Sequence, residues 1–489
     1  MSPHANDVSV SQSSVILAAP DPPATYEPNV SNKSFSSLPL PPAQLNNLDK
    51  LGYREMTPVQ ATALPLALAG KDLIAQAKTG SGKTAAFGLP LLTGLNPRDF
   101  GTQALVLCPT RELAAQVSGE IRRLARYRQN IKVVTLCGGQ PIGPQIGSLE
   151  HGTHIVVGTP GRIKDHLEKK TLSLGRVSCL VLDEADRMLE MGFIDDIDKI
   201  IQSTPKARQT LLFSATYPRN IQDISGRFQK APVHISLESL PPDQQIQQKF
   251  FICSKNGKLD ALIKLLNHYR PQTAVVFCNT RQSTRDVCSH LHQQGISVSA
   301  LHGDMEQRDR DRVLIRFRQQ SVSVLVATDV AARGLDIDDL SAVINFELPR
   351  NDEVFVHRIG RTGRADKEGL AISLFADSER YKFDSIGNYL QRELDFEAIE
   401  TLPWNEAMMP PPPYVTLLIS GGRKEKVRAG DILGALTGEA GIDGKAVGKI
   451  DISEQAAYVA IAREVADKAL GRLINGKIKG RKFKVRKLQ

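Results

Sequence analysis

A run of small residues with a lysine near its end follows a short apolar segment. Residues 77–84 read AKTGSGKT and come just after Leu73–Ala75. Small residues let backbone N–H groups approach phosphate oxygens, Lys83 can neutralise those oxygens, and the Thr84 hydroxyl can ligate Mg²⁺. A helix that begins here would point the positive end of its dipole at the same anion. The pattern predicts a loop that binds nucleotide phosphates, although a glycine-rich turn at a helix start is the simpler alternative.

An acidic tetrapeptide ends a second apolar run. Cys179–Leu182 is followed by DEAD at residues 183–186. Ligands of open α/β sheets bind at the carboxyl ends of the strands, so these carboxylates are expected beside the phosphate loop. Asp183 suits a Mg²⁺ ligand, and Glu184 suits the residue that polarises an attacking water. A solvated turn would explain the tetrapeptide alone, but not its place after a buried strand downstream of the loop.

The elements that must position these residues form two similar units. Continuous apolar runs separated by helix-sized gaps indicate strands buried on both faces of a parallel α/β sheet. The strands expected in the first unit are Ala104–Cys108, Lys132–Leu136, His154–Val157, Cys179–Leu182 and Gln209–Phe213. Those expected in the second unit are Thr273–Phe277, Val322–Ala327, Ala342–Asn345 and Leu370–Phe375.

A third unit follows four prolines at residues 410–413. Its order of strand, helix, strand, strand, helix, strand is that of RRM folds. The expected elements are Tyr414–Ser420, Ala429–Thr437, Ala446–Ile452, Ala457–Ile461, Arg463–Ile474 and Lys482–Lys487. Residues 414–489 hold 16 Lys and Arg against 8 Asp and Glu, which is nearly all of the chain's net charge of +9. This excess favours a polyanion, such as nucleic acid or an acidic membrane surface, over a merely solvated basic face.

The composition and the segment boundaries indicate a globular protein of several domains without a membrane span. The chain has 489 residues, of which 41% are hydrophobic and 24% charged, as in ordinary globular proteins. No run approaches the roughly 18 apolar residues of a membrane span, and the N-terminus does not read as a signal peptide. Six cysteines without CxxC spacing favour a cytoplasmic location. We expect a disordered extension (1–34), an α/β domain (35–238), a linker (239–248), a second α/β domain (249–400), a Pro-rich spacer (401–413) and the third unit (414–489).

With these motifs in place, the chain resembles the DEAD-box RNA helicases from Phe35 to Phe375. AKTGSGKT is that family's own form of the phosphate loop, and TPVQ at residues 57–60 resembles its adenine-reading motif. Thr57 as a helix cap with Pro58 at the first helical position would look the same without a ligand. The resemblance implies two tandem RecA-like parallel-sheet domains, with ATP and Mg²⁺ as cofactors and Thr84 and Asp183 on the metal. The implied ATP-binding residues are Phe35, Gln60, Ala77, Lys78, Thr79, Gly80, Ser81, Gly82, Lys83, Thr84, Gly334 and Asp336.

The same resemblance distributes the other roles over both domains. Arg361 and Arg364 are implied to reach the γ-phosphate from the second domain, a task that suits guanidinium groups. They join Lys83, Asp183 and Glu184 as the catalytic set. Residues implied to couple hydrolysis to strand separation are Ser214, Thr216, Asp186 and His357. Those implied to hold the RNA backbone without reading its sequence are Pro109, Thr110, Arg111, Gly139, Thr159, Gly161, Arg162, Asn279, Arg281, Gln307, Arg310 and Thr328.

Because neither domain carries a whole site, ATP and RNA must each bridge the two, and closure completes both sites. Two other classes remain as alternatives: an RNA-binding scaffold or ATP-gated clamp with little turnover, and a DNA translocase of the same superfamily. The complete catalytic set argues for hydrolysis, whereas the adenine motif and DEAD disfavour the translocase. The family separates short duplexes locally, and we expect this chain to act as a monomer.

The third unit, an α+β RRM-like domain, resembles the tail of a bacterial branch of the family directed to large-subunit ribosomal RNA. Residues 419–424, 430–438 and 448–452 carry this resemblance. It implies a 23S rRNA hairpin near the peptidyl-transferase centre as the target, and a role in 50S assembly. The stretch 454–461 lacks the aromatic set of a base-stacking RRM, so charged loops are expected to bind RNA as much as stacking does. The candidates are Arg423, Lys424, Lys426, Arg428, Tyr458, Lys477, Lys479, Arg481 and Lys482.

Overall fold

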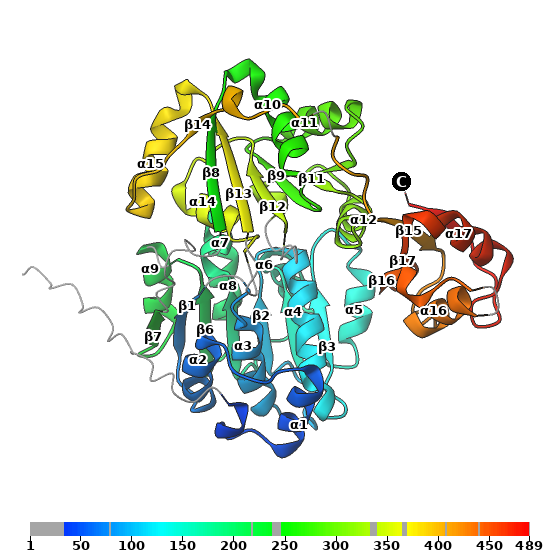
Figure 1. The fold of residues 1–489 in the computed structure, drawn as a ribbon. Coiled ribbons are helices and arrows are strands. Elements are labelled where there is room, and N and C mark those ends of the chain that lie inside the picture. Colours follow the sequence, from blue (N-terminus) through cyan, green and yellow to red (C-terminus); the bar gives the residue numbers. More distant parts are fainter. Residues whose placement is uncertain are drawn as a thin grey trace, which may run out of the picture.

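The structure, a computed structural model, describes residues 34–77, 80–216, 219–236, 246–332, 340–363, 369–405, 408–438 and 441–488. These residues form two parallel seven-stranded sheets and one four-stranded antiparallel sheet. The two parallel-sheet domains, here domain 1 and domain 2, lie one against the other, and the C-terminal domain, here the tail, lies beside them (Figure 1). Within the described ranges, no helix has the length and apolarity needed to span a membrane.

Domain 1 has its strands in the order β3-β4-β2-β5-β6-β1-β7. Both faces of the sheet are covered by helices, so its central strands are buried, as the continuous apolar runs predict. The strands are β1 (Leu73–Gln76), β2 (Ala104–Leu107), β3 (Val133–Leu136), β4 (Ile155–Gly158), β5 (Cys179–Asp183), β6 (Gln209–Ser214) and β7 (Val233–Ser236). The helices are α1 (Pro42–Leu51), α2 (Pro58–Leu68), α3 (Lys83–Thr93), α4 (Arg111–Leu124), α5 (Gly143–Leu149), α6 (Pro160–Glu168), α7 (Ala185–Glu190), α8 (Ile194–Gln202) and α9 (Arg219–Phe228).

Domain 2 repeats the architecture with the strand order β10-β11-β9-β12-β13-β8-β14. Its strands are β8 (Ile246–Ile252), β9 (Ala274–Cys278), β10 (Val298–Leu301), β11 (Val324–Thr328), β12 (Ala342–Asn345), β13 (Gly369–Phe375) and β14 (Glu397–Ala398). Its helices are α10 (Lys258–Tyr269), α11 (Arg281–Gln293), α12 (Gln307–Arg318), α13 (Asp329–Ala332), α14 (Asp352–Ile359) and α15 (Arg380–Leu390). Because all strands of each sheet run in parallel, the loops that follow them gather at one edge.

The tail has the expected strand–helix–strand–strand–helix–strand order. Its two helices pack on one face of the sheet around Leu417, Ile432 and Val459. The strands are β15 (Tyr414–Ile419), β16 (Val447–Ile452), β17 (Ala457–Ala462) and β18 (Val485–Lys487), in the order β16-β17-β15-β18. The helices are α16 (Ala429–Thr437) and α17 (Ala466–Asn475).

Two expected connectors are more ordered than the sequence suggested. The linker placed at 239–248 is too long, because β8 begins at Ile246 and pairs along its length with β13. The Pro-rich spacer placed at 401–413 packs in part on domain 2. Leu402 and Met409 are buried in the core of domain 2, and the Met409 N–H donates to Asn267 Oδ1 at 3.0 Å. The expected extension 1–34 lies, except for Ser34, outside the described residues.

Candidate nucleotide and RNA sites

The loop after β1 has the backbone that a phosphate cradle requires. Gly80 and Gly82 have φ angles of 82° and 90°, in the left-handed region that favours glycine. A Cβ at Gly82 would also collide with the side-chain amide of Gln60. Lys83, at the first position of α3, is buried and donates from Nζ to the Ala77 carbonyl at 3.0 Å. Lys78 and Thr79 lie outside the described residues.

The adenine-motif residues contact this loop directly. Thr57 caps α2, as expected for a helix start that needs no ligand, and Gln60 completes the capping box. The Thr57 hydroxyl also donates to the Ser81 carbonyl at 2.7 Å, and Gln60 Nε2 donates to the Gly82 carbonyl at 3.0 Å. Helix start and phosphate loop are therefore joined by two side chains. Phe35 is buried edge-on against Tyr53, with ring centroids 6.0 Å apart, and so belongs to the domain core.

The acidic residues lie where the strand order predicts, because β6 alone separates β5 from β1. Asp183 is 3% exposed at the end of β5, and burial raises the pKa of its carboxyl group, with the Lys83 ammonium opposing the rise. Its Oδ1 atom is buried and, among the residues that the structure describes, has no hydrogen-bond partner. A buried carboxylate oxygen without a partner suits a hard cation such as Mg²⁺.

Glu184 is held in an unusual backbone conformation and by a buried ion pair. Its φ of 54° places it in the left-handed region, which is uncommon for a residue with a side chain. Its Oε2 atom lies 2.8 Å from Nη1 of Arg187, and both side chains are almost fully buried. Arg187 is not among the residues predicted from the sequence, where only its position directly after DEAD could have pointed to a role in this site.

Asp186 joins the acidic segment to the loop after β6. Its Oδ2 atom accepts hydrogen bonds from the N–H groups of Ala215 and Thr216, each at 3.0 Å, and from the Thr216 hydroxyl at 3.2 Å. The Asp186 N–H in turn donates to Ser214 Oγ at 3.3 Å. A movement of either segment must therefore move the other.

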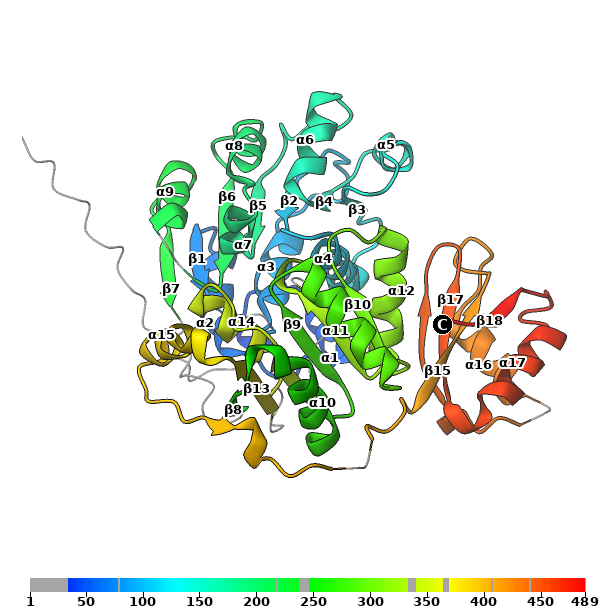
Figure 2. The ribbon, with the colours of Figure 1, turned by 90° about the horizontal axis from the view of Figure 1, so that it is seen from above.

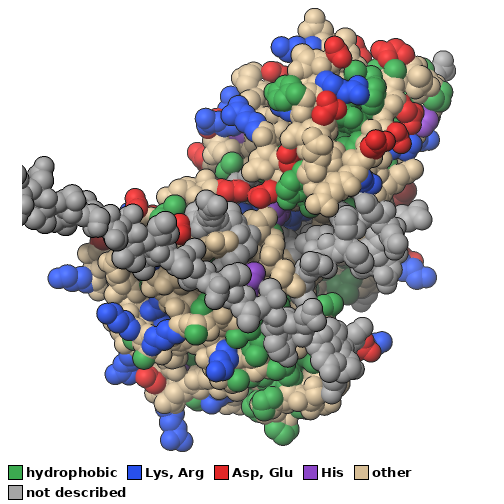
Figure 3. Space-filling view, turned by 90° about the vertical axis from the view of Figure 1, so that its left-hand side faces the viewer, with side chains coloured by type: hydrophobic (Ala, Val, Ile, Leu, Met, Phe, Trp, Pro, Cys, Tyr) green, Lys and Arg blue, Asp and Glu red, His purple; other side chains and the backbone are tan. Residues whose placement is uncertain are grey.

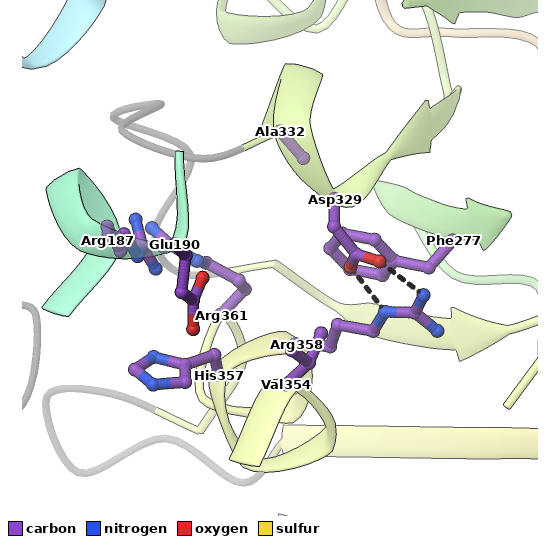
Figure 4. Close-up of a pocket in the computed structure, with 9 residues that line it drawn as sticks. All are labelled: Arg187, Glu190, Phe277, Asp329, Ala332, Val354, His357, Arg358 and Arg361. Carbon is purple, nitrogen blue, oxygen red and sulfur yellow. Dashed lines mark hydrogen bonds and ion pairs between the residues drawn. The ribbon is translucent and has the colours of Figure 1, made fainter. Parts of the chain in front are cut away.

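Domain 2 supplies residues that meet the acidic segment of domain 1. His357 and Arg361 line a small cavity of about 30 Å³ together with Arg187 and Glu190 (Figure 4). Burial lowers the pKa of His357 to about 4, with Arg187 and Arg361 acting in the same direction. The His357 imidazole is therefore neutral at neutral pH. Arg364, Gly334 and Asp336, which the sequence placed at the nucleotide, lie outside the described residues.

A second missed residue, Arg358, holds the segment around His357 in place. Arg358 is 1% exposed and forms a two-pronged ion pair with Asp329, at 2.6 and 2.7 Å. It also donates to Asn279 Oδ1 at 2.9 Å and lies over the Phe277 ring. This network ties together the segments that follow β9 and β11 and helix α14. The only sequence signal for Arg358 was its place inside the run HRIGR.

Four of the residues implied to hold the RNA backbone lie together where the two domains meet, and the acidic residue Glu112 lies with them. Arg111 at the start of α4 donates to Gln307 Oε1 at 2.8 Å, and Arg310 donates to Glu112 Oε1 at 3.0 Å. The Arg111 guanidinium also lies against Gly139, where a Cβ would collide with it. Gly139 is thus required by close packing as well as by its φ of 71°.

The remaining core candidates lie at strand ends and helix starts. Pro109 and Thr110 follow β2, and the Thr110 hydroxyl caps α4. Thr159 precedes α6, Gly161 lies in its first turn, and Arg162 donates to the Gln140 carbonyl at 3.0 Å. In domain 2, Asn279 follows β9, Arg281 begins α11 and forms an ion pair with Asp304, and Thr328 ends β11. Hydroxyls, amides and an arginine at such termini can hold phosphate and sugar groups.

In the tail, two basic loops lie side by side. Lys479 Nζ donates to the Lys426 carbonyl at 3.3 Å, and Gly421 lies against the Phe483 ring. The exposed basic residues of these loops are Arg423, Lys424, Lys426, Arg428, Lys477, Lys479, Arg481 and Lys482. On the face of the molecule opposite the tail, by contrast, basic and acidic side chains are interspersed (Figure 3). Tyr458 is not with the loops: it is 9% exposed, on the sheet.

Three family models match the chain. The family model described as DEAD/DEAH box helicase matches residues 57–224, and the helicase conserved C-terminal domain matches residues 257–366. The DbpA RNA binding domain matches residues 416–487. Together these matches cover both α/β domains and the tail.

Whole-chain relatives and solved structures point the same way. The chain is 54% identical to the ATP-dependent RNA helicase DbpA of Escherichia coli (strain K12) over 93% of this chain and 100% of that protein. It is 42% identical to the DEAD-box ATP-dependent RNA helicase CshA of Bacillus subtilis (strain 168) over 74% of this chain and 73% of that protein. S. cerevisiae Dbp5 bound to RNA and ADP BeF3 superposes with a TM-score of 0.69 at 30% identity, over 75% of this chain and 96% of that one. The chain therefore belongs to the DEAD-box ATP-dependent RNA helicases, and its tail is of the DbpA type.

Proposed function

We propose that this helicase remodels 23S rRNA during assembly of the large ribosomal subunit, directed there by its tail. The observation that carries the proposal is the convergence of two exposed basic loops, 423–428 and 477–482, on a domain that matches the DbpA RNA binding domain. Phosphate binding by such loops gives affinity, and hairpin shape gives selectivity. The specific target is the hairpin near the peptidyl-transferase centre within a pre-50S particle, and the enzyme works as a cytoplasmic monomer.

Hydrolysis follows from the groups that the two domains contribute. Lys83 and the glycine-rich loop hold the ATP phosphates, and Asp183 and Thr84 would hold Mg²⁺, which would supply positive charge to the phosphate oxygens. Glu184 orients and polarises the attacking water. Arg361 supplies positive charge to the transition state from the other domain, and Arg364 is assigned the same role from its sequence motif. Asp186, Ser214, Thr216 and His357 link these groups to the RNA side.

The RNA strand is held by Arg111, Gly139, Gln307 and Arg310 at the junction of the domains, and by the loop and helix termini on either side. Because Arg111 contacts Gln307 and Glu112 contacts Arg310, the RNA side is completed only when the domains are closed. Closure around one bent strand excludes a regular duplex, so the enzyme separates short duplexes locally.

The test is RNA-stimulated ATPase activity of the full chain with a 23S rRNA fragment that contains the hairpin, against an unrelated RNA of equal length. In the variant Arg481→Ala/Lys482→Ala the rRNA concentration for half-maximal ATPase should rise about tenfold, with a shallower salt dependence. The matched control is Lys445→Ala/Lys468→Ala, which removes the same charge from exposed residues outside the loops. The proposed targeting to 23S rRNA would be refuted if both double variants raised the rRNA concentration for half-maximal ATPase equally. It would also be refuted if the wild type did not prefer the rRNA fragment.

A further inference from the structure

Two segments that are expected to hold the RNA backbone lie next to each other in domain 1. Residues 138–140 follow β3 and residues 159–162 follow β4, and we call these two segments the RNA loops. The strands that carry them pair in parallel, and the Thr159 N–H donates to the Leu136 carbonyl at 3.1 Å. The RNA loops therefore begin side by side, at the same edge of the sheet.

Gln145 of α5 contacts the structure behind both RNA loops. It is 7% exposed, and its Nε2 donates to the carbonyl of Cys137, the residue directly before the first loop, at 3.0 Å. Its Oε1 faces Nε2 of His166 at 3.4 Å. His166 lies in the last turn of α6, whose first turn belongs to the second loop. Figure 2 shows α5 and α6 as neighbours on the side of domain 1 where β3 and β4 lie.

The surroundings of His166 fix the orientation of its ring. The side chain is fully buried, and burial lowers the pKa of the imidazole below its ordinary value of 6.5, with Arg162 acting in the same direction. The ring is therefore neutral at neutral pH. Because Gln145 Oε1 can only accept a hydrogen bond, the proton lies on Nε2, and Nδ1 is left to accept from the Thr171 hydroxyl at 2.7 Å. A rotated ring would leave buried polar groups without partners, which is costly.

Arg162 connects the two RNA loops at their front. Its Nη2 donates to the Gln140 carbonyl at 3.0 Å, and its Nε lies 3.6 Å from the Asp165 carboxylate. Its Nε and Nη1 atoms are buried and have no hydrogen-bond partner within the described part of the chain. The guanidinium is thus fixed to the first loop at one corner and keeps donors that suit a phosphate group.

From these contacts we infer that Gln145 and His166 are positioning residues, which hold the two RNA loops at the separation that neighbouring phosphates of one strand require. The inference deepens the proposed function and rests on the part of it that assigns the RNA backbone to these loops. Both side chains are buried, so they act through the loops. With Arg162 and Gln140 joined in front and Gln145 and His166 joined behind, the two loops are held at both ends, as a preorganised site needs.

The first test separates RNA affinity from ATP binding in the full chain. In Gln145→Leu the Kd for a fluorescent single-stranded oligouridine, measured with ADP and beryllium fluoride, should rise about fivefold or more, while the KM for ATP at saturating RNA stays within about twofold. The matched control is Gln103→Leu. Gln103 is also 7% exposed and donates to two backbone carbonyls, but it precedes β2, at the opposite end of the sheet. An unchanged Kd in Gln145→Leu, or an equal rise in the control, would overturn the inference.

Two milder changes at His166 test the same contact without removing a polar side chain. His166→Asn keeps a polar atom on the side of Thr171 and loses the one that faces Gln145, whereas His166→Gln keeps an amide near the position of Nε2. The Kd for the oligouridine should rise about fivefold or more in His166→Asn and stay within about twofold in His166→Gln. Equal Kd values in the two variants would contradict a role for the contact between Gln145 and His166.

Arg162→Gln distinguishes the inference from the proposal on which it rests. It should raise the Kd for the oligouridine about tenfold, because it removes a positive charge from an RNA loop. In Arg162→Gln/Gln145→Leu the rise should be smaller than the product of the two single rises, since both changes act on the same loops. An unchanged Kd in Arg162→Gln would remove these loops from the RNA site, and the inference with them. A raised Kd in Arg162→Gln together with independent effects in the double variant would overturn the inference alone.

Discussion

The guanidinium of Arg310 in domain 2 lies 3.0 Å from the Glu112 carboxylate in domain 1, and both side chains are largely buried. This ion pair joins the two domains, and it stands beside the Arg111–Gln307 hydrogen bond. The residues expected to grip RNA thus also hold the domains together.

The first prediction concerns this pair. Glu112→Gln and Arg310→Gln should each raise the RNA concentration for half-maximal ATPase, because each weakens closure. A double-mutant cycle on that quantity should give a coupling energy of about 1–2 kcal/mol. Strictly additive effects would mean that the pair does not contribute to RNA-dependent closure.

The second prediction concerns Arg187. Arg187→Gln removes the guanidinium that lies 2.8 Å from Glu184 and should lower kcat for ATP hydrolysis roughly tenfold or more, with little change in KM for ATP. Arg187→Lys should recover part of the loss, because it restores the charge. Arg126→Gln, at an exposed position, is the control. A variant that changes KM and leaves kcat intact would show that Arg187 does not position Glu184.

The third prediction concerns the metal. Because Asp183 Oδ1 is buried without a partner among the described residues, Asp183→Asn should raise the Mg²⁺ concentration for half-maximal ATPase by about tenfold or more. Chelation of Mg²⁺ should abolish turnover in the wild type. Asp195→Asn, on the exposed side of α8, should behave as the wild type does. An unchanged Mg²⁺ requirement in Asp183→Asn would remove Asp183 from the metal site.

The fourth prediction concerns pH and His357. Burial lowers the pKa of His357 to about 4, below its ordinary value of 6.5, so the unfolded chain takes up the proton first as the pH falls. The stability that the neutral imidazole contributes above pH 6.5 is therefore lost between about pH 6.5 and 4. His357→Asn lacks this titration, so its free energy of unfolding should fall by about 2 kcal/mol less over that range. Parallel unfolding curves for the two proteins would contradict the assignment.

The glycine-rich loop and the acidic segment of domain 1 can be located from the sequence, for physical reasons. A backbone that approaches phosphate needs glycine, and a buried parallel strand reads as a continuous apolar run, so residues 77–84 and Cys179–Leu182 are visible without a structure. Strands β7 and β10 were missed because they are short, half-buried edge strands. The linker was overextended because β8 begins with polar residues, IQQK.

Contacts between distant segments could not be predicted in the same way. Gln319 and Tyr458 carry no local pattern that links them, since their contact depends on how the tail lies against α12. Tyr458 stands at a position where an RRM stacks a base, so its sequence position suggested RNA. Arg187 and Arg358 resembled ordinary surface residues of helices, and only their buried partners Glu184 and Asp329 reveal what they hold.

The most direct test of the two-domain account is the ATPase rate of Arg361→Ala at saturating RNA and ATP. Arg361 lies in domain 2, beside His357 and the Arg187 that holds Glu184 of domain 1. If Arg361 supplies charge to the transition state, kcat should fall roughly 10³-fold, with ATP and RNA still bound. A kcat within about twofold of the wild type would show that hydrolysis does not need the second domain's arginine, and the account would fail.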